Sequence, residues 1–143
     1  MATESPPIQD VLIEQNGLPR IPWILFFSSL FEGDEGTSFS PNFVSLTTVG
    51  TPTITGRYYR INQRVCLFFI SIVPATSTSS TGATTYVDNF PLRFVNDSVC
   101  LVSTGSGAVQ GIGGIRASDN RIYPPSWTAA TQPLTIVGLG ITS

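Results

Sequence analysis

The side chains able to carry out chemistry in this sequence are few. Its 143 residues include seven Arg, nine acidic residues, no His and no Lys. Without His there is no imidazole to act as a base or a metal ligand. Without Lys there is no amine for a Schiff base or for a phosphate-binding loop. The numerous Ser and Thr hydroxyls therefore have no side chain of these types to activate them as nucleophiles.

Three carboxylates remain as candidates for acid–base work such as glycoside hydrolysis, which needs two of them across the scissile bond. Asp88, Asp97 and Asp119 each stand next to Asn or Ser, a context that is typical of turns. The glycines of residues 111–114 do not form a nucleotide-binding motif, because Arg116 takes the place of the last glycine. A bulge or a close backbone approach in a strand explains them better. We expect no catalytic residue, no cofactor and no enzyme activity.

The two cysteines also lack the pattern of a reactive or metal-binding pair. Cys66 and Cys100 lie 34 positions apart, without a CxxC motif and without His. We expect no metal site and interpret both residues as small apolar members of the core, with a disulfide as the alternative.

Charge is scarce and unevenly distributed. Charged residues make up 11% of the chain, against about 25% in an average domain. Residues 1–50 contain six acidic residues and one Arg, whereas residues 51–143 contain six Arg and three Asp. This balance argues against binding to nucleic acid or to a membrane surface. The longest apolar run, residues 21–27, is too short to span a bilayer, and the N-terminus lacks the basic start of a secretory signal.

Residues 1–36 are predicted to form an extended arm with one short amphipathic helix. Prolines interrupt the first twenty residues, whereas Pro22 suits a first helical turn and Gly33 suits the position just after a helix. A helix of about ten residues is not stable alone in water, so it must pack on its own β domain or on another molecule. Its apolar face consists of Trp23, Phe26, Phe27, Leu30 and Phe31, which we interpret as anchor residues.

Residues 37–143 are predicted to form an all-β domain, a jelly-roll-like β-sandwich. The chain is rich in Thr (17) and Ser (16), and its 13 Gly and 11 Pro mark turns between short apolar runs. Asn62-Gln63 is predicted to close a hairpin, and residues 75–81 to form a Ser/Thr-rich loop. The expected strands are residues 42–48, 52–55, 58–61, 64–73, 84–87, 92–95, 98–102, 108–115, 121–123 and 134–141.

The expected strand at residues 64–73 is apolar on both faces. Val65, Leu67 and Phe69 alternate with Phe68, Ile70 and Ile72. A strand at the surface of a monomeric sandwich should instead alternate apolar with polar residues. The strand therefore lies under another layer of the same chain or forms an oligomer interface. We favour the interface and place Phe68, Ile70 and Ile72 in it.

The segment 121–127 is a softer candidate for surface recognition. Arg121, Tyr123 and Trp127 bring a guanidinium and two aromatic rings together within seven residues. The alternative is that Tyr123 and Trp127 fill one end of the core, since large aromatic side chains are mostly buried.

The order of several motifs resembles a family of small virion proteins. Gly56-Arg57-Tyr58-Tyr59-Arg60-Ile61 leads into an apolar strand that ends Ile72-Val73-Pro74, and Asn120-Arg121-Ile122-Tyr123-Pro124 follows with Trp127. This order, over residues 20–142, resembles small β-sandwich proteins of tailed-bacteriophage virions. Such proteins decorate heads or form tail-fibre tips. The sequence lacks the stem, collagen-like repeat and heptads of long fibres.

The resemblance implies a homotrimer without enzyme activity or cofactor. We expect a capsid decoration (cement) protein, made in the host cytoplasm, that binds the major capsid protein at the outer surface of the virion. The alternative is a tail fibre or receptor-binding tip, whose partners are a tail component and a host glycan.

Overall fold

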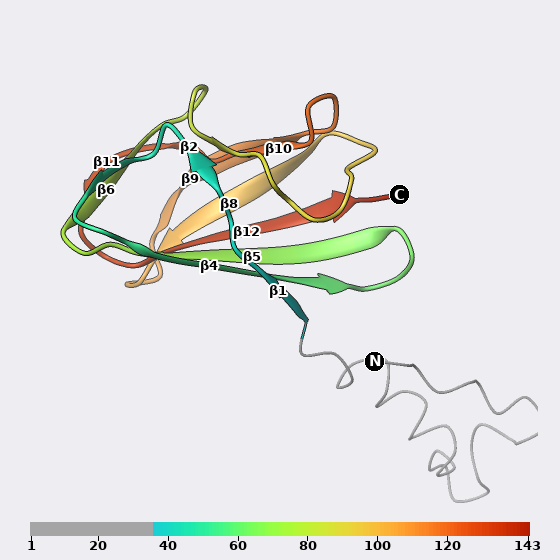
Figure 1. Cartoon of the computed structure of the whole chain (residues 1–143), viewed down its shortest axis with the longest axis horizontal. Helices are drawn as coiled ribbons and strands as arrows, with labels where there is room; N and C mark the ends of the chain where they lie inside the picture. Colours follow the sequence, from blue (N-terminus) through green and yellow to red (C-terminus); the bar gives the residue numbers. More distant parts are fainter. Residues whose placement is uncertain (1–35) are drawn as a thin grey trace, which may run out of the picture. The chain divides into compact units, whose positions relative to one another are not determined.

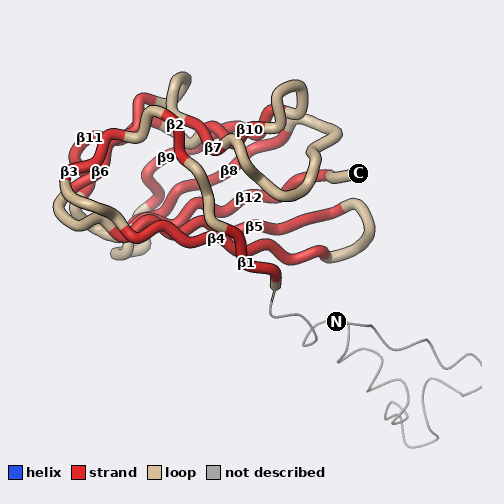
Figure 2. Tube along the Cα trace, in the orientation of Figure 1, coloured by secondary structure: helices blue, strands red, loops and turns tan. Residues whose placement is uncertain are grey.

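The computed structural model describes residues 36–143, which form twelve β-strands and no helix within that range (Figure 2). The prediction of an all-β domain is thus confirmed for this part of the chain. The predicted arm and helix, with Trp23, Phe26, Phe27, Leu30 and Phe31, lie outside the described residues. The division of the chain at residue 36 stays a prediction.

The strands are short except in the centre of the main sheet. They are β1 (Thr37–Phe39), β2 (Phe43–Val44), β3 (Thr47–Val49), β4 (Thr53–Arg60), β5 (Val65–Val73), β6 (Ser77–Thr81), β7 (Tyr86–Val87), β8 (Ser98–Thr104), β9 (Val109–Arg116), β10 (Arg121–Tyr123), β11 (Ser126–Ala130) and β12 (Leu134–Ile141).

The strands form one large curled sheet and one small sheet. The large sheet has nine strands in the order β1-β4-β5-β12-β8-β9-β10-β7-β2, and the small sheet has the order β11-β6-β3. Strands β1 and β2 lie at opposite edges of the large sheet, yet only residues 40–42 separate them in the chain. The sheet must therefore curl until its two edges come close together, and Figure 1 shows this curvature.

The core fills the inner, concave side of the curled sheet. Phe90 and Phe94 stack at 4.8 Å between ring centroids, and Phe68 lies 5.2 Å from Phe90. Cys66 and Cys100 belong to this core as free, buried thiols, as the sequence indicated. The other buried apolar residues are Ile70, Ile72, Val87, Val102, Ile115, Ile122, Trp127, Leu134 and Ile136.

Two local predictions agree with the structure. The β4–β5 hairpin closes around Asn62, whose side-chain oxygen accepts hydrogen bonds from the backbone N–H groups of Arg64 and Val65, both at 2.8 Å. The glycines of β9 combine the expected bulge with a close approach. The register shifts between Val102 and Ser103 opposite Gly111, and a Cβ on Gly113 would lie 2.2 Å from the Tyr123 carbonyl oxygen.

The predicted Ser/Thr loop at residues 75–81 is wrong, because most of it is strand β6. Thr78 and Ser80 are buried in it. A polar strand can be buried here because its hydroxyls find partners: Thr78 accepts a hydrogen bond from the Trp127 indole at 3.2 Å. The strand β11 was not predicted, and the strand predicted at residues 92–95 is reduced to a single bridge between Phe94 and Thr142.

Candidate functional site

The outer face of the central strands carries an unusual set of large apolar side chains. Paired residues on neighbouring antiparallel strands point to the same side of a sheet. One such row runs Phe69, Val137, Leu101 and Ile112 across β5, β12, β8 and β9. The adjacent row contains Leu67 and Leu139, which are paired across β5 and β12. Val99 lies two residues before Leu101 on β8, and therefore on the same side of the sheet. We call these residues the outer apolar face: Leu67, Phe69, Val99, Leu101, Ile112, Val137 and Leu139.

Within the described residues 36–143, five of the seven members of this outer apolar face are exposed, and Leu67 and Val137 are half-buried. The exposed fractions are 60% for Val99, 46% for Leu101, 67% for Ile112 and 50% for Leu139. Single exposed apolar residues are ordinary on protein surfaces, but a contiguous group across four strands marks an interaction surface.

The inner face explains why the large side chains point outward. On β12, Gly138 and Gly140 face the core while Leu139 faces solvent. A Cβ on Gly138 would lie 2.2 Å from the Phe68 ring, and one on Gly140 would lie 2.5 Å from the Phe94 ring. The core therefore accepts only glycine at these two positions, and the large apolar residue between them is on the outside.

A row of hydroxyl groups borders the outer apolar face on one side. Thr55, Ser71, Thr135 and Ser103 are paired in register across β4, β5, β12 and β8. A polar border around an apolar centre is the usual anatomy of a protein–protein interface.

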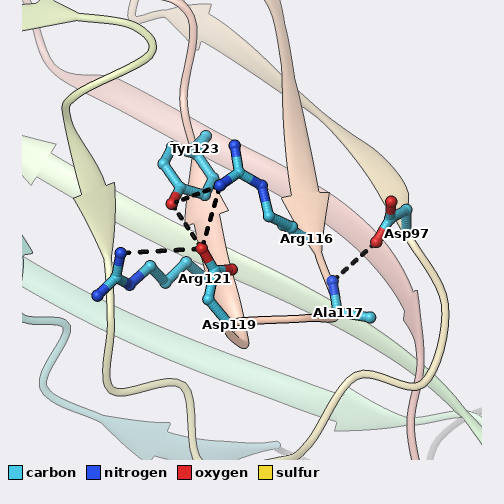
Figure 3. Close-up of polar contacts among 6 residues, drawn as sticks. All are labelled: Asp97, Arg116, Ala117, Asp119, Arg121 and Tyr123. Carbon is cyan, nitrogen blue, oxygen red and sulfur yellow. Dashed lines mark hydrogen bonds and ion pairs between the residues drawn. The ribbon is translucent and has the colours of Figure 1, made fainter.

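A polar cluster lies beyond Ile112, where β9 turns into β10 (Figure 3). Asp119 in the turn accepts hydrogen bonds through Oδ2 from the Tyr123 hydroxyl at 2.8 Å and from Arg116 at 3.2 Å, and Arg121 lies 3.8 Å from the same oxygen. The other carboxylate of the figure, Asp97, accepts a hydrogen bond from the backbone N–H of Ala117 at 2.8 Å. These contacts give Oδ2 of Asp119 and Oδ1 of Asp97 structural roles, while Oδ1 of Asp119 is buried without a hydrogen-bond partner among the described residues.

The aromatic rings of this cluster are covered by the guanidinium groups. Arg116 lies over the Tyr123 ring at 4.3 Å, and Arg121 lies over the Tyr86 ring at 4.0 Å. The same surroundings raise the pKa of Arg121, chiefly through its hydrogen bond with Tyr123. The cluster thus presents fixed positive charge rather than bare stacking platforms.

A shallow cleft of about 510 Å³ lies beside the cluster. Its walls include Arg116, Tyr123 and Pro124, and Gly113 and Gly114 of β9 form part of its lining. The cleft is lined by two charged side chains, Asp97 and Arg116, and by no thiol.

Within residues 36–143, no group of three metal-ligating side chains occurs. Burial raises the pKa of Cys66 and of Cys100 to about 11, so neither is a thiolate at neutral pH.

The structure separates the residues that the sequence singled out. Phe68, Ile70 and Ile72 are fully buried in the core of the single chain, and the opposite face of β5 is the one exposed. Arg121 and Tyr123 lie together in the polar cluster, half-buried. Trp127 is only 3% exposed and belongs to the core, as the alternative interpretation held.

Sequence reasoning did not single out Val99, Leu101 and Ile112 of the outer apolar face. The alternation of residues 98–102 carried the signal, since Val99 and Leu101 alternate with Cys100 and Val102. Which of the two sets faces solvent depends on the neighbouring strands. The polar cluster was missed as well, because Asp119 has the sequence context of an ordinary turn.

Comparison with known proteins identifies no relative. No protein-family model, no curated protein and no solved structure matches this chain. In the described residues, no helix is both long and apolar enough to cross a membrane.

Proposed function

We propose that this chain is a non-enzymatic structural protein of a tailed-bacteriophage virion, a homotrimeric capsid decoration (cement) protein. It is made in the host cytoplasm and binds the major capsid protein at the outer surface of the head. The proposal includes the jelly-roll-like sandwich architecture and an N-terminal arm with a short amphipathic helix over residues 22–32 as the anchor. The family part of the proposal rests on the motif order in residues 20–142.

The outer apolar face is the observation that carries an assembly role. Leu101, Ile112 and Leu139 stand on the central strands of the sheet and are 46%, 67% and 50% exposed. Such side chains are removed from water when the protein joins a larger structure, and their burial contributes about 25 cal/mol per Å². A decoration protein stabilises a shell by this route, because binding to the assembled shell favours the assembled state by mass action.

The proposal is tested by the copy number of the chain in purified virions, measured by quantitative mass spectrometry against the major shell protein. Abundance comparable to that of the shell protein is the expected result. A few copies per particle would replace decoration by a tail or fibre role, and complete absence from virions would overturn the virion assignment. A chain lacking residues 1–33 is expected to lose particle binding, and retained binding would contradict the anchor role.

A tail fibre or receptor-binding tip is the second candidate. The polar cluster favours it, because Arg116 and Tyr123 line the cleft of about 510 Å³ and supply charge and a hydroxyl group for a host glycan. Binding of the full chain to host cells would support this role. An Arg116→Ala variant should then bind less than the wild type, whereas an Arg93→Ala variant, changed outside the cleft, should bind equally well.

A further inference from the structure

We infer that the outer apolar face is the surface by which one copy of this chain binds a second copy. The inference rests on the assembly role proposed above and names the partner of that face. It concerns Leu67, Phe69, Val99, Leu101, Ile112, Val137 and Leu139, and not the buried side of β5 that the sequence had suggested.

The size of the face fits a partner with a broad surface. Four strands about 4.8 Å apart, each with outward side chains over about 15 Å, give a patch of roughly 290 Å² in projection. An interface of standard size covers about 800 Å² of each partner, with an apolar centre inside a polar border. The face supplies that centre, and the hydroxyl row of Thr55, Ser71, Thr135 and Ser103 supplies one border.

A short helical segment is a poorer fit to the same patch. A ten-residue helix is about 15 Å long and about 10 Å wide, so it would cover roughly 150 Å², about half of the face. The amphipathic segment at residues 22–31 is of this length, whereas a second folded domain can cover the whole patch.

Charge also favours a second copy. The seven residues of the face include no charged side chain, and Arg57 stands at its end on β4, in register with Phe69. Two such faces can meet without placing like charges opposite each other at their centres. The net charge of the chain is only −2, so long-range repulsion between copies is small.

The chain offers a matched control for this surface. Val49 on β3 is 53% exposed, close to the 60% of Val99, but it lies at an edge of the small sheet. Its register partner there is Ser77, and its neighbour Thr48 is paired with Thr78. Val49→Asp therefore introduces the same charge at a similar exposure in a polar setting.

The test measures the association of the full chain by sedimentation equilibrium over a range of concentrations. The wild type is expected to be oligomeric. Val99→Asp and Leu101→Asp should each weaken association at least about thirty-fold, because a charge buried at the centre of an apolar interface costs as much binding free energy as the loss of a hot-spot residue. Val49→Asp should associate like the wild type. Urea unfolding of all variants checks that they are folded.

Unchanged association of the folded Val99→Asp and Leu101→Asp variants would overturn the inference, as would a wild type that stays monomeric at all concentrations. If that monomer binds a hydrophobic dye only after removal of residues 1–33, the occupant of the face is the N-terminal segment, and the inference is equally overturned. The copy number in virions tests the proposed function, and sedimentation tests this interface. A chain that forms oligomers but is absent from virions would contradict the proposed function and leave the interface inference intact.

Discussion

The ring of Phe68 occupies the space that a side chain at Gly138 would need. The two residues are paired across β5 and β12, and a Cβ on Gly138 would lie 2.2 Å from the ring carbon Cζ. Leu139, the next residue along β12, is turned away from the core and is 50% exposed. The packing of one phenylalanine thus requires glycine inside, and the alternation of the strand then places a leucine on the outer apolar face.

Gly138→Ala is expected to destabilise the protein by about 2–3 kcal/mol, because the added methyl group overpacks the core against Phe68. Urea unfolding measures the loss. Gly114→Ala is the matched control, since a Cβ there would meet no atom closer than the Ser98 carbonyl oxygen at 4.0 Å. It should change the free energy of unfolding by less than about 0.5 kcal/mol. Equal losses in the two variants would contradict the packing argument.

Asn120 is expected to be a stability determinant of the β9–β10 turn. Its side chain accepts a hydrogen bond from the Phe94 backbone N–H at 2.7 Å and donates one to the Leu92 carbonyl at 3.0 Å. Its backbone has a φ of 55°, in the left-handed region. Asn120→Ala should cost about 2–3 kcal/mol, since it loses both hydrogen bonds and keeps the strained backbone.

Asn120→Gly separates these two contributions, because it removes the hydrogen bonds but relieves the left-handed strain. Thermal unfolding should place it about 1 kcal/mol above Asn120→Ala in stability. If the two variants were equally stable, the left-handed φ at position 120 would make no measurable contribution to the free energy of unfolding.

The thiols of Cys66 and Cys100 are expected to be unreactive in the folded protein. Burial raises the pKa of each thiol from 9.0 to about 11, so the reactive thiolate is rare at pH 8. Iodoacetamide should modify both cysteines rapidly in urea and at least ten times more slowly in buffer. Rapid modification without urea would show that the strands around these residues open readily.

The same shift predicts a loss of stability at alkaline pH. The folded state holds its thiol protons up to about pH 11, whereas the unfolded chain releases them from about pH 9. The contribution of the protonated thiols is therefore fully present below pH 9 and is lost as the pH rises toward 11. Urea midpoints at pH 8 and pH 10.5 measure this loss, which a Cys66→Ala, Cys100→Ala double variant should show to a smaller extent.

Asp119→Asn is expected to destabilise the polar cluster by about 1 kcal/mol, because its carboxylate pairs with both Arg116 and Arg121 at a partly exposed position. The difference from the wild type should shrink in 1 M salt, where such pairs are screened. Tyr123→Phe removes the hydroxyl that donates a hydrogen bond to Asp119 at 2.8 Å and accepts one from Arg116 at 3.3 Å, but it removes no charge. Its cost, also about 1 kcal/mol, should therefore depend on salt far less than that of Asp119→Asn. A salt-independent loss in Asp119→Asn would contradict the electrostatic explanation.

The sequence by itself determined the fold class and several local features. Short apolar runs between Gly, Pro, Ser and Thr predicted strands, because the period of two along a strand is visible in a linear pattern. Asn62 predicted a turn, and the glycines of β9 predicted a bulge. The two apolar faces of residues 65–73 also predicted that both faces of this strand are covered, by another layer of the chain or by an oligomer interface, and this stays a prediction.

Only the tertiary structure decided which face lies inside. Alternation divides Phe68, Ile70 and Ile72 from Leu67 and Phe69, but both sets are apolar, and a shift by one residue would exchange them. The curl of the sheet and the glycines opposite Phe68 and Phe94 settle this choice, and they involve residues far apart in the chain. The polar strand β6 and the cluster around Asp119 depend likewise on partners from distant segments, which no local pattern records.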